Sequence, residues 1–309
     1  WICYADWASF LALVVLALGG DGTVVGVTIG AVTTGGAVIT GGAGTITSIR
    51  LGQDKINDSE KILGNAVTLF FILGVALSFT LWFNLEWILI KFGANKEMLP
   101  YASSYMRILI PVSLANFYSY GLSNIMRAAG APKVAMFAMI IGGIANLVLD
   151  YIFIVLMGMG IEGTAYATLI GNILSAIYVL YFFIVGKPMF KIRIFGFNVD
   201  ETSSIKLKRK NLSLSFAISW SIITIGMSSF LLQIVNALVG AVINKVIVIN
   251  GGTSGVAIMT IINTYLTLIV MSVYSIAQGS QPIIGYNYGA KRFDRVRDTL
   301  KLSLIWGLI

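Results

Sequence analysis

Asp150 is the residue whose type and position most directly suggest chemistry. It is the only acid in residues 134–159, a stretch that is otherwise free of charge. Asn146 precedes it by one helical turn, so the amide and the carboxylate would share one helix face. A charged group in hydrocarbon costs at least about 2.5 kcal/mol, so this acid is expected to face protein or water and to bind a cation, carry a proton or pair with a fixed charge. A structural acid near a helix end, hydrogen-bonded to a neighbour, is the alternative.

Thr168 is expected to lie beside this pair. Asp150 falls roughly 10 Å before the outer end of its predicted helix, at 1.5 Å per residue. After the short turn at 158–163, the next helix returns Thr168 to a similar depth. Carboxylate, amide and hydroxyl oxygens suit a hard cation such as sodium. The residues therefore predict a sodium site at Asp150, Asn146 and Thr168, and the same carboxylate carrying a proton remains the other possibility.

Polar side chains recur at helical spacing in four of the predicted helices. Such residues often only provide hydrogen bonds between helices, but stripes in four helices together favour a polar cavity that holds a substrate. The candidate cavity residues are Asn116, Tyr120, Asn124, Asn172, Gln233, Asn236 and Gln278.

The composition indicates an all-α integral membrane protein. The chain is 57% hydrophobic and 11% charged, whereas soluble domains carry about 25% charged residues. Its apolar runs are continuous and reach the roughly 20 residues that span a bilayer, without the alternating polarity of a β-barrel strand. The predicted spans are 2–18, 23–49, 62–90, 99–128, 134–157, 163–185, 212–249 and 254–286, and a last one begins near 300.

The sequence also argues against most enzyme classes. It has a single cysteine, Cys3, and no histidine, which excludes a disulfide framework and removes the commonest ligands of transition metals. A Ser-His-Asp hydrolase or a zinc protease has no residues to work with. We therefore expect no enzyme and no cofactor apart from a coupling ion.

Basic residues predict the orientation in the membrane. Most of the 21 Lys and Arg lie in the connections at 50–61, 127–133, 187–210 and 291–301, which share one side if each span crosses once. The positive-inside rule makes that side cytoplasmic and the protein a multi-pass protein of the inner (plasma) membrane. The basic run 206–210 is then a topology signal near lipid headgroups rather than a nucleic-acid site.

A short internal repeat predicts two halves. Gly42, Ile46 and Gly52 recur as Gly279, Ile283 and Gly289, each 237 positions later. Parallel repeats are common in transporters. We expect an N-terminal six-helix lobe at 1–186, a cytoplasmic connecting loop at 187–211 and the start of a C-terminal lobe at 212–309. The chain begins at Trp1 and stops inside an apolar run, which is typical of part of a longer protein.

Several blocks resemble the multidrug and toxic compound extrusion (MATE) transporters. They are MRAAGAPK at 126–133, NLVLD at 146–150, GMGIEGTA at 158–165 and QGSQPIIGYNYGA at 278–290. The resemblance implies a two-lobe bundle of twelve helices in the full protein, of which about eight to nine lie in this chain. It also implies export of cationic or lipophilic drugs by a monomer, in exchange for sodium or protons. In that family, a first-helix acid completes the ion site, and Asp6 is the candidate here.

Three other functions remain as alternatives. A flippase for a lipid-linked sugar, from the same superfamily, would need a more basic cavity, and Arg107 alone lies well inside a predicted helix. An ion channel or a structural membrane subunit would be expected to need oligomeric symmetry and a pore ring, whereas the repeat favours a self-contained carrier. A membrane enzyme fits least, because neither histidine nor paired carboxylates occur within the predicted spans.

Overall fold

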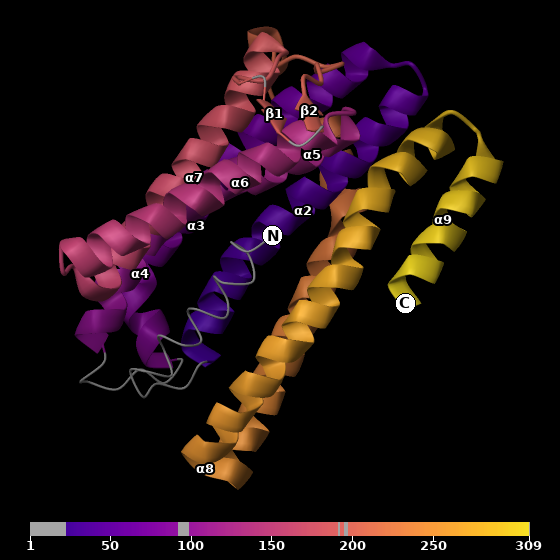
Figure 1. The fold of residues 1–309 in the computed structure, drawn as a ribbon. Helices are drawn as coiled ribbons and strands as arrows, with labels where there is room; N and C mark the ends of the chain where they lie inside the picture. The colour runs from indigo at the N-terminus through magenta and orange to yellow at the C-terminus, as the bar shows by residue number, and fades with distance from the viewer. Residues whose placement is uncertain (1–22, 92–98, 191, 195–196, 309) are drawn as a thin grey trace.

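The structure is a computed structural model that describes residues 23–91, 99–190, 192–194 and 197–308. Almost all of it is helical (Figure 1), which confirms the predicted all-α class. The predicted first span and Asp6 lie outside the described residues. The elements in chain order are α2 (Thr23–Gly52), α3 (Ile56–Lys91), α4 (Leu99–Asn116), η1 (Phe117–Gly121), α5 (Leu122–Ala128), α6 (Pro132–Asp150), η2 (Tyr151–Leu156), α7 (Gly160–Val185), β1 (Ile192–Ile194), β2 (Phe197–Val199), η3 (Arg209–Asn211), α8 (Phe216–Gly289) and α9 (Phe293–Leu308).

Five stretches of the described chain are long and apolar enough to cross a bilayer. They are Ile56–Trp87, Pro132–Leu156, Glu162–Val185, Phe216–Asn236 and Ile261–Gly289. Each overlaps a span predicted from the sequence. The predicted span 23–49 is helical as α2 but is not among the five, and the predicted span 99–128 is divided into α4, the π-helical turn η1 and α5.

Helices α2 to α7, here called the N-terminal half (residues 23–185), form one packed bundle. Its larger core joins α2, α3, α5, α6 and α7 around fully buried side chains such as Phe70, Leu122 and Ile125. A second cluster joins α3, α4 and α7 around Leu89 and Val112. These contacts fix α4, α6 and α7 relative to one another, and these helices carry Asp150 and its predicted partners.

Helix α8 turns back on itself. A straight helix of 74 residues would be roughly 110 Å long. Yet Gly226, near its start, contacts Val38 of α2, and Gly285, near its end, contacts Ser48 of the same helix. Both arms of α8 therefore run beside α2, as Figure 1 shows in orange and yellow. The two separate helices predicted at 212–249 and 254–286 are these two arms, and every residue between them is helical.

Glycines allow α2 and α8 to touch backbone to backbone. A Cβ on Gly42 would meet the carbonyl of Ile222, and a Cβ on Gly226 would meet that of Val38. At the predicted cytoplasmic ends, Gly52 lies against the carbonyl of Tyr286 and Gly289 against that of Ile49. Gly289 is the repeat counterpart of Gly52, and Tyr286 is that of Ile49, each 237 positions later. The repeat thus reappears as a reciprocal contact, as expected of small-residue packing between membrane helices.

The connecting segment after α7 is fastened to the N-terminal half. It contains the antiparallel pair β1–β2, with Ile192 opposite Val199, which the sequence did not predict. The carboxylate of Glu201 accepts a hydrogen bond of 2.9 Å from the backbone N–H of Lys133, in the first turn of α6. Glu60 of α3, which is buried, forms an ion pair of 2.5 Å with Lys208. These contacts hold the loop across the predicted cytoplasmic ends of the helices.

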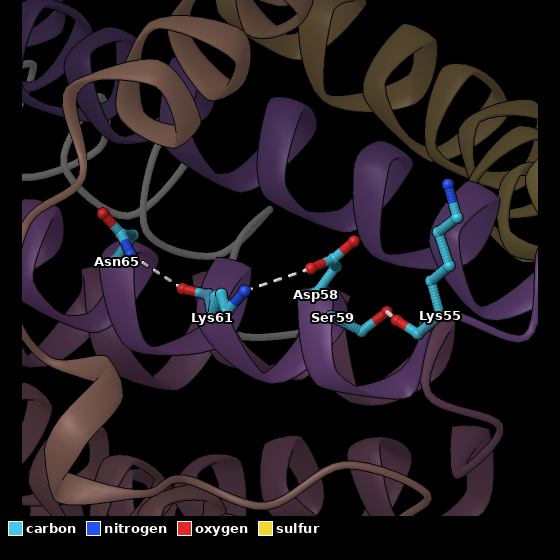
Figure 2. Close-up of polar contacts among 5 residues, drawn as sticks. All are labelled: Lys55, Asp58, Ser59, Lys61 and Asn65. Atoms are coloured by element: carbon cyan, nitrogen blue, oxygen red, sulfur yellow. Dashed lines mark hydrogen bonds and ion pairs between the residues drawn. The ribbon is translucent and has the colours of Figure 1, made fainter.

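The first turns of α3 also help to place α8 (Figure 2). Lys61 pairs with Asp58 at 3.3 Å, and its carbonyl accepts a hydrogen bond of 2.9 Å from the amide of Asn65. That bond orients the Asn65 side chain, whose oxygen accepts the backbone N–H of Ser215 at 2.7 Å. Ser215 is the N-cap residue of α8. The surface ion pair itself contributes little, whereas Asn65 ties the beginning of α8 to the N-terminal half.

The backbone contact at Gly289 predicts a large effect of one methyl group. Gly289→Ala should destabilise the protein by about 1–3 kcal/mol, the usual cost of overpacking, and lower the midpoint of thermal unfolding in detergent. Gly279→Ala is the matched control, because no atom of another described element lies within 4 Å of a Cβ there, and alanine is the better helix former. An equal midpoint for the two variants would show that α2 and α8 can move apart to accommodate the methyl group at no cost in stability.

Candidate functional site

The hairpin of α6 and α7 positions the candidate ion-binding residues. Gly158 and Gly160 both have positive φ angles, 65° and 60°, a conformation that glycine adopts readily, and they reverse the chain between the two helices. Farther into the hairpin, a Cβ on Gly142 would lie 3.0 Å from the carbonyl oxygen of Gly171, and one on Gly171 would lie 2.7 Å from that of Gly142. This pair lets the helix backbones approach closely, so that short side chains reach across.

Asn146 and Thr168 are joined across the hairpin. The amide nitrogen of Asn146 donates to the hydroxyl oxygen of Thr168 at 3.2 Å, and this hydroxyl donates to the carbonyl of Thr164 at 2.9 Å. The amide nitrogen of Asn172 donates to the carbonyl of Thr168 at 3.0 Å. The structure thus brings together two of the residues that the sequence proposed for one site, and the bond leaves the amide oxygen of Asn146 free to accept.

Asp150 lies one helical turn after Asn146, at the last residue of α6. One of its carboxylate oxygens is buried and has no hydrogen-bond donor among the described residues. The carboxylate interacts electrostatically with Tyr105 of α4, a buried residue that sequence reasoning did not select. The π-helical turn η2 begins directly after Asp150, and such turns are frequent at functional sites. An acceptor unpaired among the described residues, one helical turn from an amide that is itself bonded to a hydroxyl, is suited to binding a cation or a proton.

A polar recess adjoins this hairpin. Its volume is about 50 Å³, which accommodates a few waters or an ion but is far below the roughly 300 Å³ of a small drug pocket. A drug in this recess would therefore need a more open arrangement of the surrounding helices. The polar lining consists of five residues predicted for the cavity or the ion site, together with two serines; they are Asn116, Tyr120, Asn146, Thr168, Asn172, Ser119 and Ser175.

The π-helical turn η1 lies within the series of polar residues that the sequence placed on one face. Asn116, Tyr120 and Asn124 recur every fourth residue, as one face of an α-helix would require. Asn116 and Tyr120 line the recess, whereas buried Asn124 donates to the carbonyl of Thr40 in α2 at 3.4 Å. That all three belong to one substrate cavity stays a prediction.

Gln278 of α8 contacts the N-terminal half directly. Its amide nitrogen donates to the hydroxyl of Tyr120 at 3.0 Å, and its amide oxygen accepts from the guanidinium of Arg127 at 3.0 Å. Arg127 also donates to Asn124 at 3.3 Å. From the sequence, Arg127 was assigned only to the basic side of the membrane, because its spacing gives no sign of the distant glutamine. The position of α8 against α2 brings them together.

The remaining predicted residues are not gathered at the recess. Gln233 is half-buried and Asn236 is exposed on the first arm of α8, and the recess is lined without them. Asp6 lies outside the described residues. Within the described part of the chain, no three acids, cysteines or histidines lie close enough to hold a metal ion, so a cation there would rely on one carboxylate and on neutral oxygens.

Comparison with known proteins identifies the family. The family model described as MatE matches residues 8–152 and 216–309. The chain belongs to the MatE family. The resemblance inferred from the sequence blocks, which lie mainly in these two ranges, is thereby confirmed.

Curated relatives of this MATE chain are export proteins rather than enzymes. It is 25% identical over 269 residues to the multidrug export protein MepA of Staphylococcus aureus (strain bovine RF122 / ET3-1), covering 85% of this chain and 55% of that protein. It is 22% identical over 264 residues to MepA of Staphylococcus saprophyticus, with the same coverage. The chain thus spans about half the length of the curated relatives it matches.

Solved structures show the same fold. The chain superposes on the MATE multidrug transporter DinF-BH, determined in complex with a small molecule, with a TM-score of 0.78 at 27% identity, over 99% of this chain and 63% of that one. A multidrug resistance MATE transporter of the MOP superfamily in an outward-facing conformation gives a TM-score of 0.82 at 23% identity, over 97% and 64%. The fold is that of the MATE transporters.

The bond between Asn146 and Thr168 predicts a measurable contribution to stability. Thr168→Val should lower stability by about 0.6–1.7 kcal/mol, the range for hydrogen bonds between membrane helices, and lower the unfolding midpoint in detergent. Thr80→Val is the control, because both hydroxyls donate to a carbonyl four residues earlier, at 2.9 and 2.8 Å, and Thr168 also accepts a bond from another helix. Equal midpoints for the two variants would contradict the contribution of the cross-helix bond.

Proposed function

We propose that this chain is the larger part of a secondary antiporter that exports organic cationic or lipophilic drugs in exchange for sodium or protons. The observation that carries the proposal is found at the α6–α7 hairpin, where a buried carboxylate oxygen of Asp150, without a donor among the described residues, lies one turn from the amide of Asn146, which is bonded to the hydroxyl of Thr168. The multidrug export relatives, and the multidrug transporter determined in complex with a small molecule, support the drug substrate.

The donor set fits sodium. The buried carboxylate oxygen of Asp150, which has no donor among the described residues, supplies negative charge, and the amide oxygen of Asn146, whose nitrogen bonds Thr168, is a second ligand. The hydroxyl oxygen of Thr168 accepts one bond from Asn146 and keeps a second lone pair. These are the hard oxygen ligands that such cations prefer. A proton would instead need the carboxylate alone, so the two coupling ions make different demands on Asn146 and Thr168.

Exchange requires the ion and the drug to favour different conformations. An ion drives export only as far as it binds one arrangement of the helices more tightly than the other. The ion-binding residues and the recess adjoin each other at α6 and α7, and Thr168 belongs to both. Because Thr168 lines the recess, an ion bound beside it acts on the wall of the cavity that we propose widens from this recess to hold the drug. Tyr120 lines the same recess and offers an aromatic face for organic cations.

The flippase alternative is not favoured by the charges. A lipid pyrophosphate would need several cations facing the cavity. Arg107 pairs with Glu86 at 3.4 Å on an exposed face and lies over the ring of Trp82, so it is not free for such a headgroup. The recess lining contains no charged residue among those that the structure describes.

We propose further that the exporter acts as a monomer, contacts membrane lipids and binds no nucleic acid.

Transport in proteoliposomes tests the role of Asp150. Asp150→Asn in the complete transporter should reduce gradient-driven export of a cationic dye by roughly tenfold or more, within the usual range of coupling between sites. Asp58→Asn is the control, since that half-exposed carboxylate lies far along the chain from the site and pairs with Lys61 in its own helix. Sodium and proton gradients imposed separately identify the coupling ion.

Two results would count against this mechanism. Export that survives Asp150→Asn under both gradients would assign Asp150 a structural role. Absence of dye export by the unaltered protein under either gradient would favour the flippase, which can be followed with a fluorescent polyprenyl-linked substrate in the same vesicles.

The proposed orientation places the basic loops in the cytoplasm of a cell whose plasma membrane holds the protein. In a Cys3→Ser background, a cysteine at exposed Met159, in the α6–α7 turn, should react in whole cells with a membrane-impermeant maleimide. A cysteine at exposed Thr202, in the connecting segment, should react only after the cells are opened. The reverse pattern would invert the topology.

A further inference from the structure

The second arm of α8 is joined to the N-terminal half by more than glycine packing. Gln281 donates to the hydroxyl of Thr45 in α2 at 2.7 Å, and Gln278, nearly one turn earlier, uses both ends of its amide on other residues. The amide oxygen of Gln278 accepts from Arg127 and its nitrogen donates to Tyr120. One neutral side chain thus spans two residues of the opposite half.

Arg127 is the unusual member of this group. It lies in the last turn of α5, largely buried, and its Nε has no hydrogen-bond partner among the described residues. Its hydrogen-bond partners, Asn124 and Gln278, are neutral, and no ion pair to Arg127 occurs in the described part of the chain. A buried cation held by amides is retained at some cost in desolvation, so a purely structural contact would be better served by an apolar pair.

The cost becomes useful if the two halves separate. Hydrogen bonds to a charged donor are stronger than neutral ones, so Arg127 and Gln278 favour the closed arrangement. When the halves part, the guanidinium regains water, which compensates for the lost bond. Among the described residues, no backbone hydrogen bond joins α2 to α8 at the glycine contacts of Gly52 and Gly289, on the same side. The contact is therefore firm but reversible.

We propose that Arg127 and Gln278 form a latch that holds the cytoplasmic ends of the two halves together and opens when the transporter faces the cytoplasm. The proposal rests on the proposed function in two respects, that the two halves alternate between two arrangements and that the basic loops face the cytoplasm. Arg127 and Gln278 are positioning residues here, since neither lies in the recess or contacts the ion-binding residues.

The latch is tested by a distance rather than by transport. Spin labels at Thr202→Cys and Arg295→Cys, both exposed, report the separation of the halves in the complete transporter with Cys3→Ser, in liposomes without drug. Thr202 moves with the N-terminal half, because the neighbouring Glu201 is bonded to α6. Electron–electron double resonance then gives the populations of short and long distances.

Gln278→Ala should lower the ratio of closed to open molecules by about tenfold, as expected for loss of one bond to a charged group. Gln278→Glu should raise that ratio, because a carboxylate opposite Arg127 forms an ion pair, and its second oxygen accepts from the Tyr120 hydroxyl, which in the unaltered protein accepts from the amide of Gln278. Arg127→Lys keeps the charge but loses the planar fork, so a smaller decrease is expected. Ser280→Ala is the control, since that hydroxyl bonds within α8.

Two results would overturn the latch. One is a distance distribution of Gln278→Ala equal to that of Ser280→Ala. The other is a shift of Gln278→Glu in the same direction as Gln278→Ala, which would mean that only packing at this position matters. Neither readout depends on dye export. A protein that exports no dye, but in which Gln278→Ala lowers and Gln278→Glu raises the ratio of closed to open molecules, would keep the latch and lose the proposed drug substrate.

Discussion

The backbone contact between α2 and α8 is the interaction on which the arrangement of the two halves depends. Lipid tails give apolar helices little reason to associate with each other, so membrane helices rely on close packing and on hydrogen bonds. Glycines at 42, 52, 226 and 289 provide the close packing, since a Cβ at any of them would strike a carbonyl of the facing helix. The polar contacts of Gln278 and Gln281 with the N-terminal half follow from that approach, because they come from the arm of α8 that the glycines hold in place.

The candidate ion site and the contacts between the halves share structural elements. The α4–η1–α5 segment contributes Asn116 and Tyr120 to the recess, and Tyr120 also accepts a hydrogen bond from Gln278 of α8. The other side of the same recess is formed by α6 and α7, which hold Asn146 and Thr168. A change in the recess and a change in the spacing of the halves therefore act on one tyrosine. This shared contact offers a physical route between ion binding and lobe movement, which spatial proximity alone does not prove.

Local sequence patterns anticipated the helices and part of the site. The helical spacing of Asn146 and Asp150, and the short turn that returns Thr168 to the same depth, depend only on helix geometry, and the bond between Asn146 and Thr168 agrees with them. The regular spacing of Asn116, Tyr120 and Asn124 gave no sign of the π-helical turn that includes Tyr120, and only the first two line the recess in the structure. Tyr105 was missed because its nearness to Asp150 arises from the packing of α4, 45 residues earlier in the chain.

The sequence by itself determined that the chain is helical and crosses a membrane, since the length and continuity of its apolar runs are properties of the sequence alone. It also determined the family, through blocks of residues that can be compared directly. Only the tertiary structure decided that α8 folds back along α2 and that Arg127 meets Gln278. It also decided that the connecting segment contains the strand pair β1–β2 and is bonded to the N-terminal half through Lys208 with Glu60 and through Glu201 with Lys133. Arg127 and Gln278 are 151 positions apart, and periodicity, which describes neighbours within one helix, contains no information about which helix lies opposite.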